Sequence, residues 1–504
     1  MILNRQNLPE ITNIDVLKPV DSVFDLPEKI IQFGTGVLLR GLPDFYIDKA
    51  NREGVFNGRI VIVKSTDQGD TVAFEQQDNL YTTCVRGIEN KETVNQQIVN
   101  ASISRVLTAT KDWDQIIEAA INPAIKIIIS NTTEAGITSS SEDISVGVPS
   151  SFPGKLLAIL FARFQECKGD PDAGFIILPT ELISNNADQL KEYVLQLAAI
   201  NHMNQLFIRW IKTANSFCNT LVDRIVPGKL ASEDYKETTS KLGYDDELMI
   251  MVEPFSLWAI ESSDPQVIEK LSFAQVNKGV AIVPDIQKFK ELKLRLLNGT
   301  HTLSCAIALL MGFDTVKKAM ENDDFLAYVS DLMETEIGPS ILDENITNED
   351  VQVFSKSVID RFRNPFLDHQ WKAISLNYTS KIKLRILGLL NKWYQLHRHA
   401  PEHIALGFAA YVILMDTKEI NGAFQTQHIA SNFNIQDEYA SALYQQWAKG
   451  SHQISDILKS TAVWEQDLSA FPGFYNAVAN YIQQISSIGI EAVLKKQEQL
   501  KYEN

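Results

Sequence analysis

One nine-residue run, K-L-R-L-L-N-G-T-H at positions 293–301, restricts what this chain can fold into more than any other segment. It carries an amine, a carboxamide and an imidazole at Lys293, Asn298 and His301. At about 100° per helical residue these side chains fall near 0°, 140° and 80° around the axis, so all three can face one cavity. Apolar residues cover most of the remaining surface, which predicts a buried helix. Burial would lower the pKa of Lys293 towards the range needed for proton transfer, although three polar residues in one helix can also be purely structural.

Length and charge limit the class of protein. A chain of 504 residues exceeds what one hydrophobic core usually supports, so two or three domains are expected. Aspartate and glutamate number 63 against 46 lysines and arginines, which gives a formal net charge of −17. This excess of negative charge argues against nucleic acid or an anionic membrane as the main partner. An anionic small molecule would need a local group of basic side chains.

Cysteine spacing and the first residues predict a cytoplasmic protein. The four cysteines are scattered and form no C-x-x-C pair, which is typical of reduced thiols rather than disulfides. Charged and polar residues interrupt the first twenty positions, so no export signal is expected there. The longest apolar run, residues 404–415, is too short to span a bilayer, and no membrane association is expected.

The two halves of the chain differ in their hydrophobic pattern. Up to about residue 285, short β-branched runs alternate with segments of helical spacing, which is typical of a doubly wound, mainly parallel α/β sheet. The predicted strands are 30–33, 60–63, 125–129, 175–178 and 280–283. After residue 285, apolar residues recur at helical intervals, as in 316–333, 373–393 and 404–415. We therefore expect an α/β domain over residues 1–285 and a mostly α-helical domain over residues 286–504.

A glycine-containing turn follows the first predicted strand. It consists of Phe33, Gly34, Thr35 and Gly36. Glycines permit a tight turn and the approach of a pyrophosphate, and a helix N-terminus attracts negative charge, so these four residues are candidates for binding NAD. The third glycine of G-x-G-x-x-G is missing, because Leu39 takes its place and Gly41 comes two residues late. An ordinary βα turn is therefore the alternative.

Two other strand ends can contribute to a nucleotide site. The second strand is followed by Lys64 and, three residues later, by Asp67. Asp67 could bind the ribose of NAD and Lys64 could attract the 2′-phosphate of NADP; the first interpretation is preferred. The segment 130–136 follows the strand 125–129 and places Asn131, Thr132 and Glu134 at the carboxyl edge of the sheet, where ligands of such folds bind.

Five motifs occur in an order that resembles one enzyme family. They are I-I-Q-F-G-T-G-V-L-L-R-G at 30–41, S-N-T-T-E-A-G-I at 130–137, N-S-F-C-N-T-L-V-D-R-I-V at 215–226, V-E-P-F at 252–255 and K-x-x-x-x-N-x-x-H at 293–301. Together they resemble the mannitol dehydrogenase family of long-chain polyol dehydrogenases. The resemblance implies a Rossmann-type N-terminal domain, a helical C-terminal domain, NAD as cofactor and no required metal.

The resemblance also implies roles for individual residues. Lys293 matches the family's general acid/base, while Asn298 and His301 match groups that hydrogen-bond the carbonyl oxygen and a neighbouring hydroxyl. One departure concerns Leu182, which takes the position where mannitol dehydrogenases carry an asparagine, so a simple hexitol substrate is disfavoured. A sugar acid would instead need basic partners for its carboxylate.

Candidates for substrate binding lie in further segments that resemble the family. They are Asp223, Arg363, His369 and Lys381, with Lys381 the best match to a family substrate contact. Other basic residues nearby are Arg361, Lys383 and Arg385. For all of these basic residues an ion-paired or solvated role is the alternative.

Three histidines close together in sequence invite a metal-site interpretation. They are His397, His399 and His403. Pro401 should end a helix between the second and the third, so one helix cannot present all three. We expect no metal site.

The resemblance, together with these features, implies an NAD-dependent reductase of a small-molecule keto sugar acid, and the resemblance alone implies reversible conversion of tagaturonate to altronate in hexuronate breakdown as the preferred reaction. Fructuronate and fructose are alternative substrates within the same class. A dinucleotide-sensing protein without turnover is the alternative from another class, which the intact set of Lys293, Asn298 and His301 disfavours. No oligomeric state follows from the sequence.

Overall fold

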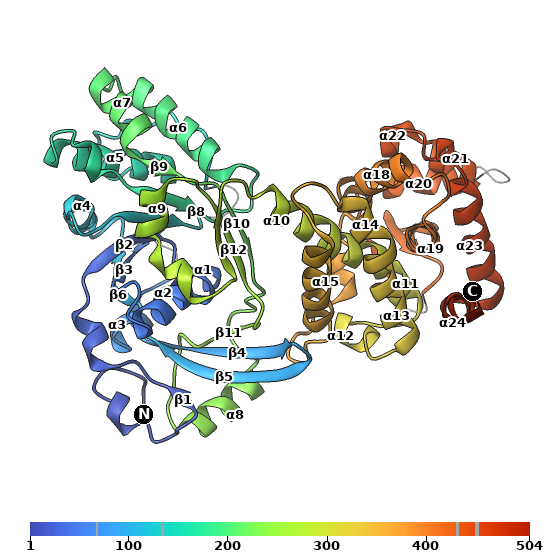
Figure 1. Cartoon of the computed structure of the whole chain (residues 1–504), viewed down its shortest axis with the longest axis horizontal. Coiled ribbons are helices and arrows are strands. Elements are labelled where there is room, and N and C mark those ends of the chain that lie inside the picture. The colour runs from blue at the N-terminus through green and yellow to red at the C-terminus, as the bar shows by residue number, and fades with distance from the viewer. Residues whose placement is uncertain (67–68, 133–135, 430–432, 449–452, 504) are drawn as a thin grey trace. The chain divides into compact units, whose positions relative to one another are not determined.

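The protein divides into two compact units. The computed structural model describes residues 1–66, 69–132, 136–429, 433–448 and 453–503. Unit 1 comprises Met1–Arg86 and Thr93–Ile286, and unit 2 comprises Gln287–Asn504 together with Gly87–Glu92. The chain therefore passes from one unit to the other three times (Figure 1). The expected domains, 1–285 and 286–504, are each continuous in sequence. They do not predict that the second unit also includes a short segment from the first hundred residues.

The centre of unit 1 is a six-stranded parallel sheet (Figure 1). Its strands are β2 (Glu28–Phe33), β3 (Arg59–Lys64), β6 (Ile103–Thr108), β7 (Ile127–Ser130), β8 (Ile176–Pro179) and β9 (Ser216–Phe217). They lie in the order β6-β3-β2-β7-β8-β9, and all neighbouring pairs are parallel. This order reverses direction between β2 and β7, the place where doubly wound sheets bind their ligands. The predicted Rossmann-type fold is confirmed.

Two hydrophobic cores cover the two faces of this sheet. In β2, Ile30 belongs to one core, whereas Ile31 and Phe33 belong to the other. Helix α2 (Pro43–Arg52) packs on the first face. The second face carries α4 (Trp113–Ile121), α5 (Phe152–Glu166), α6 (Asn186–Ile200) and α7 (Gln205–Ala214). Because both faces are covered, β2, β3, β7 and β8 are largely apolar, and their sequence pattern predicts them. The pattern does not predict β6, which contains Ser104 and Arg105, or the two-residue β9.

Unit 1 contains two further sheets that the sequence predicts only in part. One combines β1 (Val16–Leu17), β5 (Glu92–Asn100), β4 (Tyr81–Glu89) and β11 (Ile250–Val252), and the other combines β10 (Thr220–Asp223), β12 (Leu257–Glu261) and β13 (Val280–Val283). The predicted strand 280–283 exists as β13 but lies outside the six-stranded sheet. Most of β5 is polar and at least partly exposed, so a search for buried apolar runs misses it.

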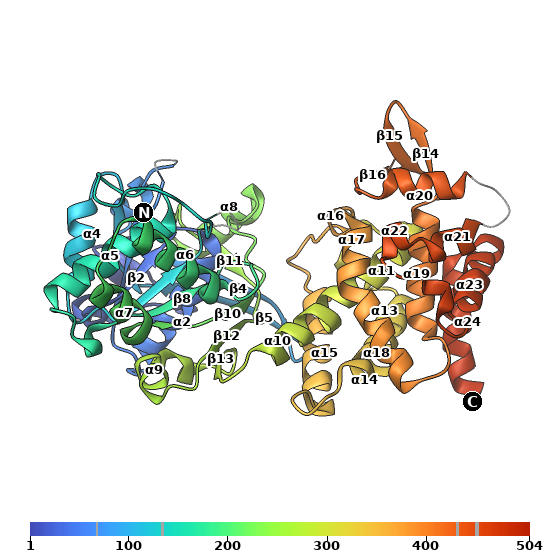
Figure 2. The ribbon, with the colours of Figure 1, turned by 90° about the horizontal axis from the view of Figure 1, so that it is seen from above.

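Unit 2 is mostly helical, as predicted. Its helix α19 (Glu402–Leu414) is buried almost throughout and packs against α11 (Thr300–Leu310) and α23 (Phe474–Ile488). A small antiparallel sheet projects from the helices (Figure 2) and consists of β14 (Thr417–Ile420), β15 (Ala423–Thr426) and β16 (Asn434–Ile435). Within the described residues, no helix has both the length and the apolar character needed to cross a membrane.

Three π-helical segments interrupt the helices in the described part of unit 2. They are η5 (Lys293–Gly299), η6 (Leu332–Ile337) and η7 (Lys383–Leu387). A π-helix bonds residues five apart rather than four apart, and such segments occur frequently at functional sites. Each of the three contains a charged residue that is at least partly buried: Lys293, Glu336 and Arg385, respectively.

Candidate active site

The glycine turn after β2 is a constrained piece of backbone. Gly34 has a φ of 125°, and its N–H donates to the carbonyl of Val63 at 3.1 Å. A Cβ atom at Gly34 would lie 2.9 Å from Cδ1 of Leu39 and 3.0 Å from the carbonyl oxygen of Asn131. Only glycine fits this position without strain. Gly36 precedes α1 (Val37–Gly41) with no side-chain cap, and the space beside its Cα is open. The turn can therefore receive a ligand at its backbone.

The third glycine of the fingerprint is displaced rather than lost. A Cβ atom at Gly41 would lie 2.9 Å from side-chain atoms of both Val226 and Val252. Close packing of a helix against strands is the role of the third glycine in dinucleotide-binding turns. Gly41, two residues later, therefore permits the close packing that a side chain as large as that of Leu39 would prevent.

A buried arginine supports the turn. Arg40 is 7% exposed, and its Nε donates to the carbonyl of Thr35 at 3.3 Å while its Nη1 donates to the carbonyl of Leu248. Its guanidinium also lies 5.3 Å from the ring centre of Tyr81. Sequence reasoning missed Arg40, although a basic residue inside an otherwise apolar helix was a signal that could have found it.

The segment after β7 is held by a buried carboxylate. Glu181 accepts hydrogen bonds from the N–H and the hydroxyl of Thr132, both at 2.9 Å, and from the hydroxyl of Ser130 at 3.1 Å. The Nδ2 of Asn131 donates to the carbonyl of Thr180 at 3.0 Å. Burial raises the pKa of Glu181, and the hydrogen bonds from Thr132 oppose that shift. Glu181 is a second residue that sequence reasoning missed, and its position two residues after the end of β8 was the available signal.

The ribose end of the expected nucleotide site is described in part. Lys64 is 8% exposed, and its Nζ donates to the carbonyl of Thr66 at 2.5 Å. Its amine is thus engaged within the chain. Two other predicted cofactor residues, Asp67 and Glu134, lie outside the described residues.

The predicted catalytic residues lie on consecutive helical segments, but not on one regular α-helix. Lys293 and Asn298 belong to η5, and His301 lies in the first turn of α11. An α-helix would separate Lys293 and Asn298 by about 140°, whereas residues five apart in a π-helix lie much closer to one face. The angles expected from α-helical geometry are therefore wrong. The π-helical bonding of η5 places the Lys293 amine and the Asn298 carboxamide closer together around the helix axis than an α-helix would.

Burial differs among the three candidates. Lys293 and Asn298 are half-buried, so the expected full desolvation of the lysine is wrong. His301 is 8% exposed, and its ring stacks on Phe362 with ring centres 4.0 Å apart. Its Nε2 atom is buried and has no hydrogen-bond partner among the described residues. A buried ring nitrogen without a partner is unfavourable unless a ligand supplies one.

Positive charge surrounds His301. Burial lowers the pKa of His301 well below its ordinary value, and His369, Arg361, Arg385 and Lys381 lower it further. The ring of His369 lies 5.2 Å from that of His301. His301 is therefore neutral at physiological pH and can use one ring nitrogen as a donor and the other as an acceptor.

The predicted substrate residues divide into two groups. His369 and Lys381 lie close enough to His301 to influence its charge. Arg363 caps the C-terminus of α15 (Asn348–Phe362) and is exposed, whereas Arg361, two residues earlier, is buried. Asp223 ends β10 in unit 1 and is 8% exposed. The side chain of Leu182 is 60% exposed.

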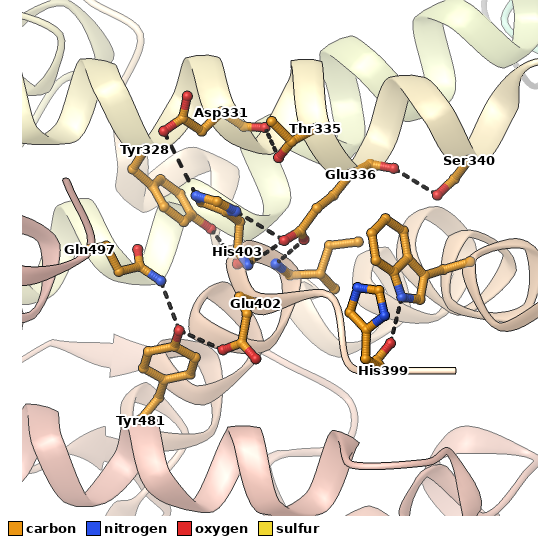
Figure 3. A network of polar contacts seen from close by, with 12 residues as sticks. Tyr328, Asp331, Thr335, Glu336, Ser340, His399, Glu402, His403, Tyr481 and Gln497 are labelled. Carbon is orange, nitrogen blue, oxygen red and sulfur yellow. Dashed lines mark hydrogen bonds and ion pairs between the residues drawn. The ribbon is translucent and has the colours of Figure 1, made fainter. Parts of the chain in front are cut away.

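The histidine run has structural roles. His397 stacks on Trp393 with ring centres 4.0 Å apart, and the carbonyl of His399 accepts a hydrogen bond from the Trp393 indole at 2.7 Å. The His403 ring lies beside Glu336 (Figure 3). Its Nδ1 is 2.9 Å from Oε1 of that carboxylate. Among the described residues, no group of three histidine, cysteine or acidic side chains is arranged to hold a metal ion.

Glu336 also caps a helix. Its carboxylate accepts hydrogen bonds from the backbone N–H groups of His403 at 2.7 Å and of Ile404 at 2.8 Å, at the start of α19 (Figure 3). The residue is 4% exposed and lies in η6. The first N–H groups of a helix have no acceptor within the helix. In α19, Glu336, which is distant in sequence, accepts hydrogen bonds from two of them.

A chain that combines a doubly wound sheet and its glycine turn with a helical unit carrying a lysine, an asparagine and a histidine has the parts of a nucleotide-dependent oxidoreductase. Residues 28–271 match the family described as the mannitol dehydrogenase Rossmann domain, and residues 285–486 match the mannitol dehydrogenase C-terminal domain. The chain belongs to the mannitol dehydrogenase family.

Curated relatives are similar over nearly the whole chain. An altronate oxidoreductase of Bacillus subtilis (strain 168) is 34% identical over 483 residues, which cover 94% of this chain and 96% of the relative. An altronate oxidoreductase of Yersinia enterocolitica is 33% identical and covers 93% of this chain and 96% of the relative.

Solved structures share the fold. The mannitol 2-dehydrogenase of Pseudomonas fluorescens, in a ternary complex with NAD and D-mannitol, has a TM-score of 0.69 and 22% identity, and the match covers 99% of this chain and 100% of that one. A D-sorbitol dehydrogenase has a TM-score of 0.80 and 21% identity, with coverage of 98% and 100%.

Proposed function

We propose that this chain is an NAD-dependent reductase of a keto sugar acid, which converts tagaturonate to altronate reversibly. The observation that carries the proposal is the similarity to altronate oxidoreductases at 34% identity over 94% of the chain. The basic side chains around the neutral His301 support it, because a sugar acid brings a negative charge into the site.

The residues of unit 1 fit a dinucleotide. Phe33, Gly34, Thr35 and Gly36 form a turn that a Cβ atom would obstruct, and Asn131 and Thr132 border it at the end of β7. When bound, NAD supplies or accepts the hydride at the substrate carbon.

Gly34→Ala should weaken NADH binding by about tenfold or more, because left-handed strain costs roughly 1–3 kcal/mol and the new methyl group meets Leu39 and Asn131. Fluorescence titration with NADH measures the effect. Gly54→Ala is the matched control: Gly54 also has a positive φ, of 68°, but has open space around it. Equal affinities in the wild type and Gly34→Ala would contradict a cofactor role for the turn.

The residues of unit 2 supply the remaining chemistry. In the reductive direction Lys293 donates a proton to the oxygen of the ketone as negative charge develops there. The Asn298 carboxamide donates a hydrogen bond to the same oxygen, which stabilises that charge. His301, held by its stacking on Phe362, hydrogen-bonds a neighbouring hydroxyl through the ring nitrogen that has no partner within the described chain. Oxidation of the alcohol uses the same groups in reverse.

The proposed function is tested by the oxidation of NADH and NADPH with tagaturonate, fructuronate and fructose measured side by side. We expect tagaturonate with NADH to give the highest kcat/KM. A preference for fructuronate or fructose would change the assigned substrate. NADH binding without any ketone-dependent loss of its absorbance would instead indicate a dinucleotide sensor.

A further inference from the structure

Two basic side chains beside His301 lack a carboxylate partner among the described residues. They are Lys381 in α17 (Tyr378–Ile382) and Arg385 in η7. The Nζ of Lys381 donates to the carbonyl of Ile374 at 2.8 Å, and Arg385 bonds only to neutral oxygens. Both side chains are partly buried, and burial is the first cause of the lowered pKa of each. Buried cations usually have an anionic partner.

Two other basic side chains in this region form ion pairs with acidic residues of the chain. Lys383, between the two, lies 2.8 Å from the carboxylate of Glu465. Arg295 in η5 lies 3.3 Å from the carboxylate of Glu291 and also donates to the carbonyl of Arg385. The chain therefore neutralises these two cations with its own acidic residues. Among the described residues, neither Lys381 nor Arg385 forms an ion pair, although the more distant Asp437 partly offsets the lowered pKa of Lys381.

Arg385 is fixed in place at one end of its guanidinium. Its Nη1 donates to the hydroxyl of Thr302 at 3.0 Å and to the carbonyl of Asn298 at 3.3 Å, so it is tied to the segments that carry Asn298 and His301. Its Nε is screened from water and has no acceptor among the described residues. None of the hydrogen bonds formed by the described chain uses Nη2. The guanidinium thus keeps one edge, Nε and Nη2, for an acceptor with two oxygens.

We propose that Arg385, assisted by Lys381, binds the substrate carboxylate and makes the site selective for sugar acids over uncharged ketoses. A carboxylate matches the paired donors of a guanidinium edge, and the adjacent amine adds a second positive charge. This inference rests on the proposed function. It assigns the carboxylate to η7 and not to the exposed Arg363.

Binding of altronate and of the uncharged mannitol to the NADH-loaded enzyme, in which the alcohol cannot be oxidised, tests the assignment when measured by calorimetry. Arg385→Met should weaken altronate binding by about 30-fold or more and leave the weak binding of mannitol unchanged. Lys381→Met should have the same direction and a smaller effect. Lys383→Met is the matched control, because Glu465 already pairs with that amine, and its altronate affinity should stay within about twofold.

The outcomes separate this inference from the proposed function. Unchanged altronate affinity in Arg385→Met overturns the carboxylate assignment, even where the wild type reduces tagaturonate. Loss of altronate affinity in Arg385→Met supports the carboxylate assignment. If the wild type binds altronate but does not reduce tagaturonate, the proposed function is overturned while the assignment stands. A wild type that does not bind altronate overturns both.

Arg385 also bonds to its neighbours, so its replacement could impair folding. Thermal unfolding of each variant reports this directly. Where Arg385→Met does not fold, Arg385→Lys decides the question, since lysine keeps the charge and loses the paired donors. Weaker altronate binding with unchanged mannitol binding supports the assignment, and unchanged binding of both overturns it.

Discussion

In Lys293→Ala we expect kcat for tagaturonate reduction to fall by about a thousandfold or more. General acid–base catalysis by a positioned side chain contributes roughly 10²–10⁴ in rate, and alanine cannot supply the proton. NADH binding should persist, because the glycine turn belongs to unit 1 and Lys293 to unit 2. Steady-state kinetics and an NADH titration of the same preparation measure both quantities.

Lys288→Ala is the matched control for that experiment. Lys288 lies one turn earlier in α10 (Gln287–Leu292), and its amine lies 2.6 Å from the carboxylate of Asp350. We expect its kcat to remain close to that of the wild type. Near-normal turnover in Lys293→Ala would remove the proton-transfer role of that lysine.

In Glu336→Ala we expect unit 2 to lose about 3 kcal/mol of unfolding free energy, because each buried donor left without a partner costs roughly 1–3 kcal/mol. The donors concerned are the N–H groups of His403 and Ile404 at the start of α19. For a unit of this size the loss corresponds to a decrease in Tm of roughly 6–12 °C, measurable by calorimetry.

Glu334→Ala separates the capping role of Glu336 from a general effect of removing charge from η6. Glu334 lies in the same segment and is exposed. Its replacement should change the Tm by no more than about 2 °C. A Glu336→Ala variant as stable as Glu334→Ala would show that the helix start does not need the carboxylate.

The sequence predicts those parts of the fold whose residues face the interior on both sides. β3, β7 and β8 are covered on both faces, so each contains an unbroken apolar run, and in β2 the run is interrupted by Gln32. β5 has a largely polar and partly exposed surface, and its pattern does not distinguish it from a loop. The division of 373–393 into several helices is hidden for another reason, since the residues keep helical spacing across the breaks.

The sequence predicts which residue types form the candidate site more fully than it predicts how those residues are arranged in space. Sequence spacing places Lys293, Asn298 and His301 together, but π-helical hydrogen bonding depends on packing that spacing does not encode. Arg361 and Arg363 are equivalent in the sequence, and only the end of α15 decides that one is buried and the other exposed. The lack of a carboxylate beside Arg385, within the part of the chain that is described, can be recognised only once its neighbours are placed.

The wide turn at 293–299 makes the number of residues as important as their identity. Asn298, five residues after Lys293, lies nearly where a residue four positions later would lie in an α-helix, because π-helical bonding accommodates one additional residue. If the same residues adopted ordinary α-helical bonding, everything from Thr300 onwards would rotate by about 100° relative to Lys293. The imidazole would then point away from the amine although every functional side chain was retained. A homologue that preserves the motif letter by letter but lacks the wide turn could thus still lack the site.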